Sequence, residues 1–263
     1  MKNKIIIFFG LLICIPFSSM AWGLLGHRIV GQIADSYLTK HTKKEIYKIL
    51  GTESVAIASN WPDFIKSDPS FSYLDPWHYV NLKPGMTSDE VKLFLDEDTA
   101  TDAYTKINFL VTELKTTTLT QENKVLYLRL LIHIVGDIHQ PLHTGRLDDQ
   151  GGNKIKVLWF NSPANLHQVW DSRLIDFQQL SFTEYAQSIN YTTKAQRKEW
   201  QSEPLNNWIF QSYQIAEKLY ADIKLPEEKL SYQYNFKYLA TINQQLLKGG
   251  VHLAGLLNDI FSN

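Results

Sequence analysis

The chain contains nine residues of types that can bind a metal ion, spaced along its first two thirds. They are Trp22, His27, Asp63, His78, His133, Asp137, His143, His167 and Asp171. His133 and Asp137 stand four residues apart in "HIVGDIHQPLH", and His167 and Asp171 repeat this spacing in "HQVWD". Residues four apart share one face of a helix, so each pair can direct an imidazole nitrogen and a carboxylate oxygen at one point. These ligands suit zinc, and the pattern predicts a zinc-dependent hydrolase.

Residues 1–21 have the features of a secretory signal peptide. Lys2 and Lys4 precede an apolar run over residues 5–17, and "SSMA" supplies the small residues of a cleavage site just before Trp22. The apolar run is too short to cross a bilayer comfortably. We therefore expect a secreted or periplasmic protein, not anchored in a membrane after cleavage, with residues 22–263 forming one domain.

Composition limits both the metal site and the partners. The only cysteine, Cys14, precedes the expected cleavage site, so histidine and carboxylate rather than thiolate would hold the metal. Of the 26 basic residues, Lys2 and Lys4 leave with the signal peptide, so 24 face 27 acidic ones. Without a polybasic face, recognition of a nucleic acid would be local and its salt dependence shallow.

Apolar periodicity predicts helices in the first half of the chain. Helical spacing covers residues 26–38 and then 42–50, with Thr42 as a cap and Gly51 as the end. Ser54 is expected to cap a helix over 55–66. Amphipathic stretches follow at about 99–115 and 121–139.

Fewer segments are expected to be extended. "PWHYVNL" follows a turn at Asp68 and Pro69, and "KIKVLWF" is the best strand candidate, as one arm of a small hairpin or as an extended segment. From Asn165 to Asp259 the pattern is mostly helical, with breaks near Pro204 and Pro226. The predicted fold class is mainly α.

Six motifs in order give the chain a resemblance to the S1/P1 nuclease family of zinc-dependent, single-strand-specific nucleases. They are "WGLLGHRIVGQIA", "NWPDFIK", "HYVN", "HIVGDIHQPLH", "GGN" and "NLHQVWD". The resemblance covers essentially all of residues 22–263. It implies a single-domain helical fold of the phospholipase C/P1 nuclease type and three zinc ions per chain.

The resemblance also implies how the ligands divide among the three ions. The free α-amine and carbonyl of Trp22 would chelate one zinc with His27, which requires cleavage after Ala21. A second zinc would be held by Asp63, His78 and His133, with Asp137 bridging it to the first. His143, His167 and Asp171 would hold the third.

The catalytic and substrate-binding roles carry over from the same family. Asp63 would orient or deprotonate the attacking water, and Lys66 would neutralise charge on the phosphate. Tyr79 would stack on a nucleobase, while Asn153 would contact the base. Asn81 stands where fungal members carry aspartate, and because an amide donates as well as accepts, base preference is expected to differ.

The implied activity is hydrolysis of single-stranded DNA and RNA to 5′-phosphorylated products, with cleavage of 3′-nucleotides as its companion, by a monomer. Two alternatives remain at this stage: a zinc-dependent phospholipase C acting on lipid head groups, and an exported protein whose zinc is purely structural. Three histidines are expected to be structural rather than ligands. These are His41, His139 and His252.

Overall fold

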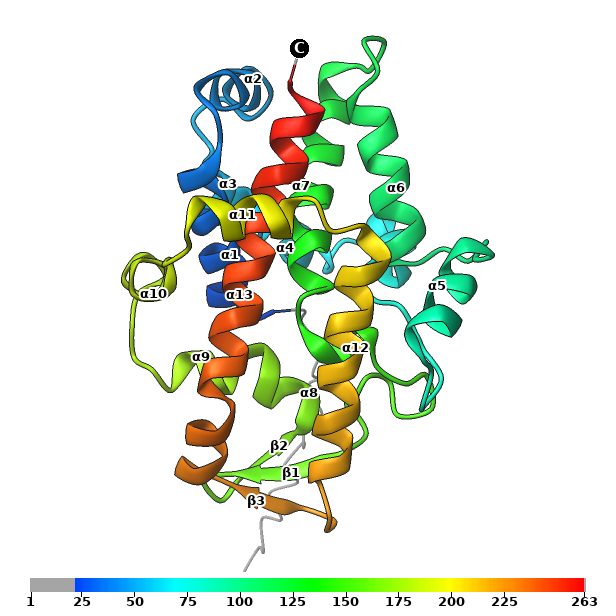
Figure 1. Ribbon diagram of the computed structural model, residues 1–263, viewed down its shortest axis with the longest axis vertical. Coiled ribbons are helices and arrows are strands. Elements are labelled where there is room, and N and C mark those ends of the chain that lie inside the picture. Colours follow the sequence, from blue (N-terminus) through cyan, green and yellow to red (C-terminus); the bar gives the residue numbers. More distant parts are fainter. Residues whose placement is uncertain (1–21, 263) are drawn as a thin grey trace, which may run out of the picture.

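The computed structural model describes residues 22–262, so the expected signal peptide lies outside the described residues. The fold is mainly α, as predicted, with one small sheet (Figure 1). The helices are α1 (Leu24–Tyr37), α2 (Lys40–Leu50), α3 (Val55–Ala58), α4 (Trp61–Ile65), α5 (Ser88–Asp96), α6 (Ala103–Leu114), α7 (Gln121–Asp137), α8 (Leu166–Gln168), α9 (Leu174–Asp176), α10 (Phe182–Ile189), α11 (Lys194–Gln201), α12 (Leu205–Asp222) and α13 (Tyr232–Ile260). Short 3₁₀ helices cover Pro69–His78 and Pro141–Thr144, and a π-helical turn covers Val169–Arg173.

The helix caps correct one sequence prediction and confirm two. Thr39, not Thr42, caps α2, because its side chain accepts a hydrogen bond from the Thr42 amide. Gly51 ends this helix with a φ of 63°, a conformation that favours glycine. Ser54 caps α3 as expected, accepting from Ile57 N.

Two further boundaries differ from the prediction because of proline. The helix expected over 55–66 is divided into α3 and α4, and Pro62 occupies the first turn of α4, where its missing amide hydrogen costs nothing. The segment expected to be extended from Pro76 begins only at Tyr79. The residues before it belong to the 3₁₀ helix Pro69–His78. Asp68 caps this 3₁₀ helix by accepting from Ser70 N.

The sheet has three strands in the order β2-β1-β3. The strand expected in "KIKVLWF" is β1 (Lys156–Trp159), and it pairs antiparallel with β2 (Ser162–Asn165), which confirms the hairpin. A parallel partner, β3 (Glu228–Leu230), was not predicted. In Figure 1 the sheet lies at the end of the molecule opposite the C-terminus.

The core forms where α13 crosses α1 and α7, and Figure 1 shows α13 running along much of the molecule's length. The approach is close at Gly250, where an added Cβ would lie 2.5 Å from Ile33 Cγ2. The last turns of α7, from Leu128 to Asp137, are buried on most sides. The C-terminal half of α7 is therefore packed on most sides, which suits a helix that must hold side chains in fixed positions.

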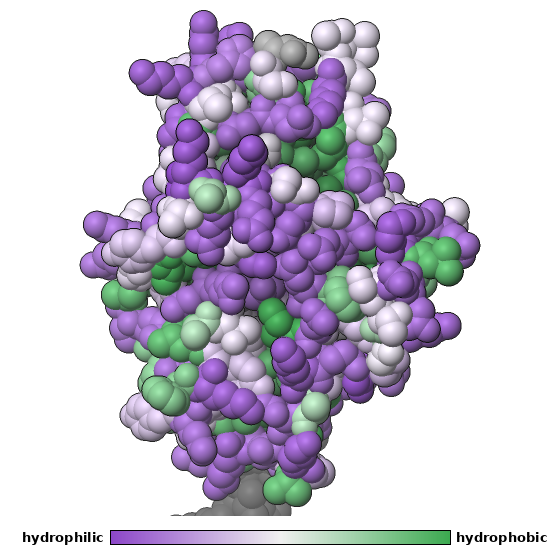
Figure 2. Space-filling model, in the orientation of Figure 1, coloured by the Kyte–Doolittle hydropathy of each residue, from purple (hydrophilic) through white to green (hydrophobic). Residues whose placement is uncertain are grey.

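The outer surface is mainly polar on the face that Figure 2 shows, with apolar residues in scattered groups. Within residues 22–262, none of the helices has the length and apolar character needed to cross a membrane.

Candidate metal centre and active site

The structure brings eight of the nine predicted metal ligands, all except Trp22, together in three buried groups, with the ligand atoms of each group within 4.8 Å of one another. They come from α1, α4, α7, α8, both 3₁₀ helices and the π-helical turn. The groups are His27 with Asp63 and His133, His78 with His133 and Asp137, and His143 with His167 and Asp171.

Asp137 lies between the ligands of the first two groups. Its Oδ1 is 3.2 Å from His27 Nε2, and its Oδ2 is 2.9 Å from His78 Nδ1 and 3.2 Å from His133 Nε2. Asp63 Oδ1 is 3.9 Å from His133 Nε2. One carboxylate with an oxygen toward each side has the geometry of a bridging ligand.

The third group is built around the four-residue spacing in "HQVWD". His167 Nε2 lies 3.1 Å from Asp171 Oδ2, and His143 Nε2 lies 4.0 Å from Asp171 Oδ1. Gln140 Nε2 donates a hydrogen bond of 2.5 Å to the same Oδ1. We had not predicted a role for Gln140, although its place between two ligands in "HIVGDIHQPLH" was a usable signal.

Backbone carbonyls fix the orientation of three of the histidines. The Nδ1 atoms of His133, His143 and His167 lie 2.6, 2.5 and 2.7 Å from the carbonyl oxygens of Ser59, His78 and Gly151, respectively. Each Nδ1 can therefore donate, which leaves the Nε2 lone pair directed at the carboxylates. This outer hydrogen bond is typical of metal-binding histidines.

The ligand atoms that face one another are short of hydrogen bonds. Among the described residues, six buried side-chain atoms of these three groups have no hydrogen-bond partner. They are His27 Nδ1, His27 Nε2, Asp63 Oδ2, Asp137 Oδ1, His143 Nε2 and His167 Nε2. A buried polar atom left unsatisfied costs about 1–3 kcal/mol. Imidazole and carboxylate donors converging in this way fit zinc, which would satisfy them.

The protonation states of His27, His143 and Asp137 favour metal binding at neutral pH. Burial lowers the pKa of His27 to about 4 and that of His143 to about 3, so both imidazoles are neutral. Burial opposes ionisation of Asp137, but His133 and His143 outweigh it and hold the pKa of Asp137 well below its usual range. Metal ligands need these deprotonated forms.

His133 and His167 behave differently, and in His167 burial is outweighed by the neighbouring Asp171, which raises the pKa of the imidazole. In His133, burial disfavours the charged form, but Asp137 and Asp63 outweigh that effect and raise the pKa of His133. Below that pKa a metal ion must displace a proton from His133, so affinity for metal should rise with pH.

Trp22 is buried beside the ligands. Its indole Nε1 donates a 2.7 Å hydrogen bond to the carbonyl of Gly136, the residue before Asp137. The next residue, Gly23, donates its amide to Asp171 O at 2.7 Å. The chain thus enters the fold between ligands of two groups, and coordination by the Trp22 α-amine stays a prediction.

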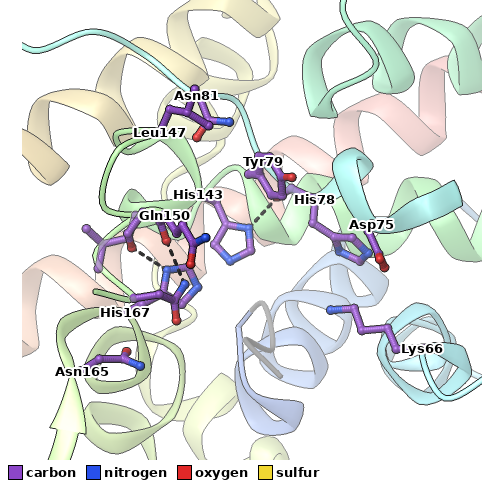
Figure 3. Close-up of a pocket in the computed structure, with 13 residues that line it drawn as sticks. Lys66, Asp75, His78, Tyr79, Asn81, His143, Leu147, Gln150, Asn165 and His167 are labelled. Carbon is purple, nitrogen blue, oxygen red and sulfur yellow. Dashed lines mark hydrogen bonds between the residues drawn. The ribbon is translucent and has the colours of Figure 1, made fainter. Parts of the chain in front are cut away.

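A cleft of about 700 Å³ opens above the second and third groups. All four predicted substrate-binding residues line it: Lys66, Tyr79, Asn81 and Asn153. Figure 3 shows Lys66 and His78 on one side of the cleft and His167 and Asn165 on the other. Tyr79 is 39% exposed, so its ring is available for stacking.

The cleft also includes residues that sequence analysis had not singled out. They are Asp75, Leu142, Leu147, Gln150, Gly151 and Asn165. Leu142, Gly151 and Asn165 lie within the quoted motifs, whereas Asp75, Leu147 and Gln150 belong to no motif and no spacing pattern marked them. His139 and His252, expected to be structural, lie outside the three ligand groups and contact each other, with His139 Nε2 2.7 Å from His252 Nδ1.

Known proteins share sequence similarity with this chain. Endonuclease 3 from Arabidopsis thaliana is 29% identical over 266 residues, which cover 93% of this chain and 90% of that protein. Nuclease P1 from Penicillium citrinum is 27% identical over 268 residues, covering 91% and 97%. Nuclease S1 from Aspergillus oryzae is 30% identical over 158 residues, covering 58% and 54%. The family model described as S1/P1 Nuclease matches residues 22–262, and the chain belongs to that family.

Proposed function

We propose that this protein is a zinc-dependent phosphodiesterase that cuts single-stranded DNA and RNA to 5′-phosphorylated products and also hydrolyses 3′-nucleotides. The observation that carries the proposal is the position of Asp137 between His27, His78 and His133, beneath a cleft that is lined by His78 and Lys66. The three groups of donors would hold three zinc ions.

Zinc ions bound there would lower the pKa of a water molecule and polarise the phosphate oxygens of the substrate. The remaining chemistry belongs to side chains of this chain. Asp63 has a side chain that is only 1% exposed, and one of its oxygens, Oδ2, has no hydrogen-bond partner. That oxygen can orient the attacking water or accept its proton.

Lys66 is suited to stabilise the charge that develops on the phosphate. Its Nζ is 2.6 Å from Asp63 Oδ1, and its side chain is 22% exposed at the cleft. A fixed ammonium group aimed at the developing charge stabilises the transition state more than the ground state.

The nucleobase would bind on the side of the cleft formed by Tyr79, Asn81 and Asn153. Stacking on Tyr79 is indifferent to base identity, which suits an enzyme acting on many sequences. The amides of Asn81 and Asn153 would then supply the hydrogen bonds that set base preference.

Export and activation would be linked through Trp22. Cleavage of the expected signal peptide after Ala21 would convert the Trp22 amide nitrogen, which cannot bind zinc, into a free amine. Zinc can displace the proton of an amine with a pKa near 8. We therefore propose a secreted or periplasmic, monomeric enzyme that becomes active on processing.

The proposal is tested by digesting denatured DNA with purified protein that begins at Trp22. Activity is measured after chelation and after zinc is restored, and the product termini are identified. Zinc-restored cleavage with 5′-phosphate ends is expected. No cleavage by protein that carries about three zinc ions would overturn the proposal.

Two controls separate the alternative functions. Asp63→Asn should abolish the cleavage that the parent shows. If the zinc is purely structural, parent and variant should both lack phosphodiesterase activity. Release of phosphocholine from phosphatidylcholine, without cleavage of DNA, would instead indicate a phospholipase C.

A further inference from the structure

One face of α12 contacts both chain segments that carry the candidate base-binding residues. We call residues 79–86 the first cleft segment, which includes Tyr79 and Asn81, and residues 145–153 the second cleft segment, which includes Asn153. The two segments lie side by side, since Leu82 N donates to Gly145 O at 3.0 Å. Tyr213, Glu217 and Tyr220 follow a helical spacing of four and three residues, so they share one face of α12.

Tyr213 and Tyr220 each bind one segment. The Tyr213 hydroxyl accepts from Met86 N at 2.8 Å and donates to Lys83 O at 2.9 Å, both in the first cleft segment. The Tyr220 hydroxyl accepts from Arg146 N at 3.1 Å and donates to Asp149 Oδ1 at 3.2 Å, both in the second.

Glu217 joins the two segments through one carboxylate. Its Oε2 accepts from Gly85 N at 3.2 Å, and its Oε1 accepts from Arg146 Nη2 at 2.9 Å and from Arg146 Nε at 3.2 Å. The Arg146 guanidinium also lies over the Tyr220 ring, 4.2 Å from its centroid. Arg146 is therefore held by charge and by ring contact.

The hydrogen bonds from α12 also restrain the part of the second cleft segment that lies next to the cleft. Asp149 Oδ1, which accepts from Tyr220, also accepts from Gly152 N at 2.7 Å. Gly152 precedes Asn153, so the loop that presents Asn153 is tied to α12 through Asp149. Within residues 22–262, the hydrogen bonds of the Tyr213, Glu217 and Tyr220 side chains go to the two cleft segments and not to a candidate metal ligand.

We infer that Glu217, with Tyr220, is a positioning residue that fixes the base-binding side of the cleft, and that it sets substrate affinity and base preference without taking part in metal binding. The inference rests on the proposed nuclease function. A carboxylate that shares its two oxygens between two segments holds their relative position, and a shift of about 1 Å there displaces Asn81 and Asn153 from a bound base.

The test compares Glu217→Gln and Tyr220→Phe with the parent enzyme and with a matched control, Glu53→Gln. Glu53 forms a similar half-buried pair with Arg129, at 2.7 Å and with side-chain exposures of 19% and 24%, against 25% and 28% for Glu217 and Arg146. Values of kcat and KM are measured on single-stranded oligonucleotides of each base, together with zinc content and thermal stability.

We expect Glu217→Gln and Tyr220→Phe to raise KM roughly three- to tenfold, as for the loss of one half-buried hydrogen bond. Both should change the order of kcat/KM among the four bases, while kcat and zinc content stay at parental values. Glu53→Gln should leave KM and base order unchanged. Zinc content must be measured because Gly151 O of the second cleft segment contacts Nδ1 of His167, a candidate zinc ligand.

Parental KM and base order in both variants would overturn the inference, and so would a rise in KM that occurs only with loss of zinc. Absence of cleavage by the parent enzyme would instead reject the proposed function. In that event the inference is tested without catalysis, by calorimetry. The affinities of the parent and of Glu217→Gln for the four 5′-mononucleotides are compared. Equal affinities in the parent and Glu217→Gln would count against it.

Discussion

Lys66, the residue that follows α4, donates a 2.6 Å hydrogen bond from its Nζ to Oδ1 of Asp63, which lies within that helix. Burial disfavours the charged form of Asp63, but His133 and Lys66 outweigh it and lower the pKa of this carboxyl below its usual value. Asp63 therefore stays ionised among the histidines, and the lysine that it holds reaches the cleft. The acid and the cation act as a pair.

Replacing Lys66 with methionine removes the cation but keeps most of the apolar stem. We expect kcat to fall about 100- to 1,000-fold, the range for loss of one preorganised charge-stabilising group, with zinc content unchanged. Lys66→Arg, which keeps the charge, should retain more activity. Equal kcat in Lys66→Met and the parent would exclude this role.

Removal of metal should lower activity and stability together. The buried ligand atoms of Asp137, His143 and His167 that lack hydrogen-bond partners would lose the ion that satisfies them. Zinc at 100 times its Kd stabilises a protein by about 2.7 kcal/mol per site. Thermal denaturation with and without a chelator measures the change, and a chelated protein that melts at the parental temperature would contradict the prediction.

Acid should destabilise the protein through the His139–His252 pair as well as through the metal ligands. Burial lowers the pKa of His139 from 6.5 to about 4, and burial and the neighbouring His139 lower that of His252 well below its usual value. The unfolded chain thus binds these protons at a higher pH than the folded one. The contribution to stability is complete above about pH 6.5 and is lost as the pH falls toward 4.

Urea denaturation of chelated protein between pH 7 and pH 4 checks this expectation. The free energy of unfolding attributable to His139 should fall by up to about 3 kcal/mol over that range. His139→Asn, which does not titrate there, should show a shallower dependence on pH. Parallel curves for the variant and the parent would show that the pair is not responsible.

Asn81→Asp should change which bases are preferred. The amide at this position can both donate and accept a hydrogen bond, whereas an ionised carboxylate only accepts. We expect the relative rates of release of the four mononucleotides to differ between variant and parent, with zinc content equal. Identical release profiles would mean that Asn81 does not contact the base.

The clustering of the candidate metal ligands was predictable because ligand chemistry leaves a spacing in the sequence. His133 and Asp137 are four residues apart since both must project from one face of α7. The β1–β2 hairpin was predictable for a similar reason, from a short apolar run that ends in a turn.

Contacts between distant segments leave no such spacing. Nothing near Glu217 in the sequence indicates that it contacts Gly85 and Arg146, more than 70 residues away. Likewise, β3 pairs with β1 only because the chain returns to it after α12. Thr39 and Thr42 carry the same hydroxyl three residues apart, and the sequence pattern does not show which of them caps α2.

The Tyr213, Glu217 and Tyr220 face of α12 also bears on how such an enzyme could diversify. All nine predicted ligands lie before residue 172, whereas this face lies more than 40 residues beyond the last of them. Mutations in α12 could alter substrate choice while every donor atom to zinc is retained. Directed evolution toward new base preferences could therefore begin with a library confined to this helix and the two loops that it restrains.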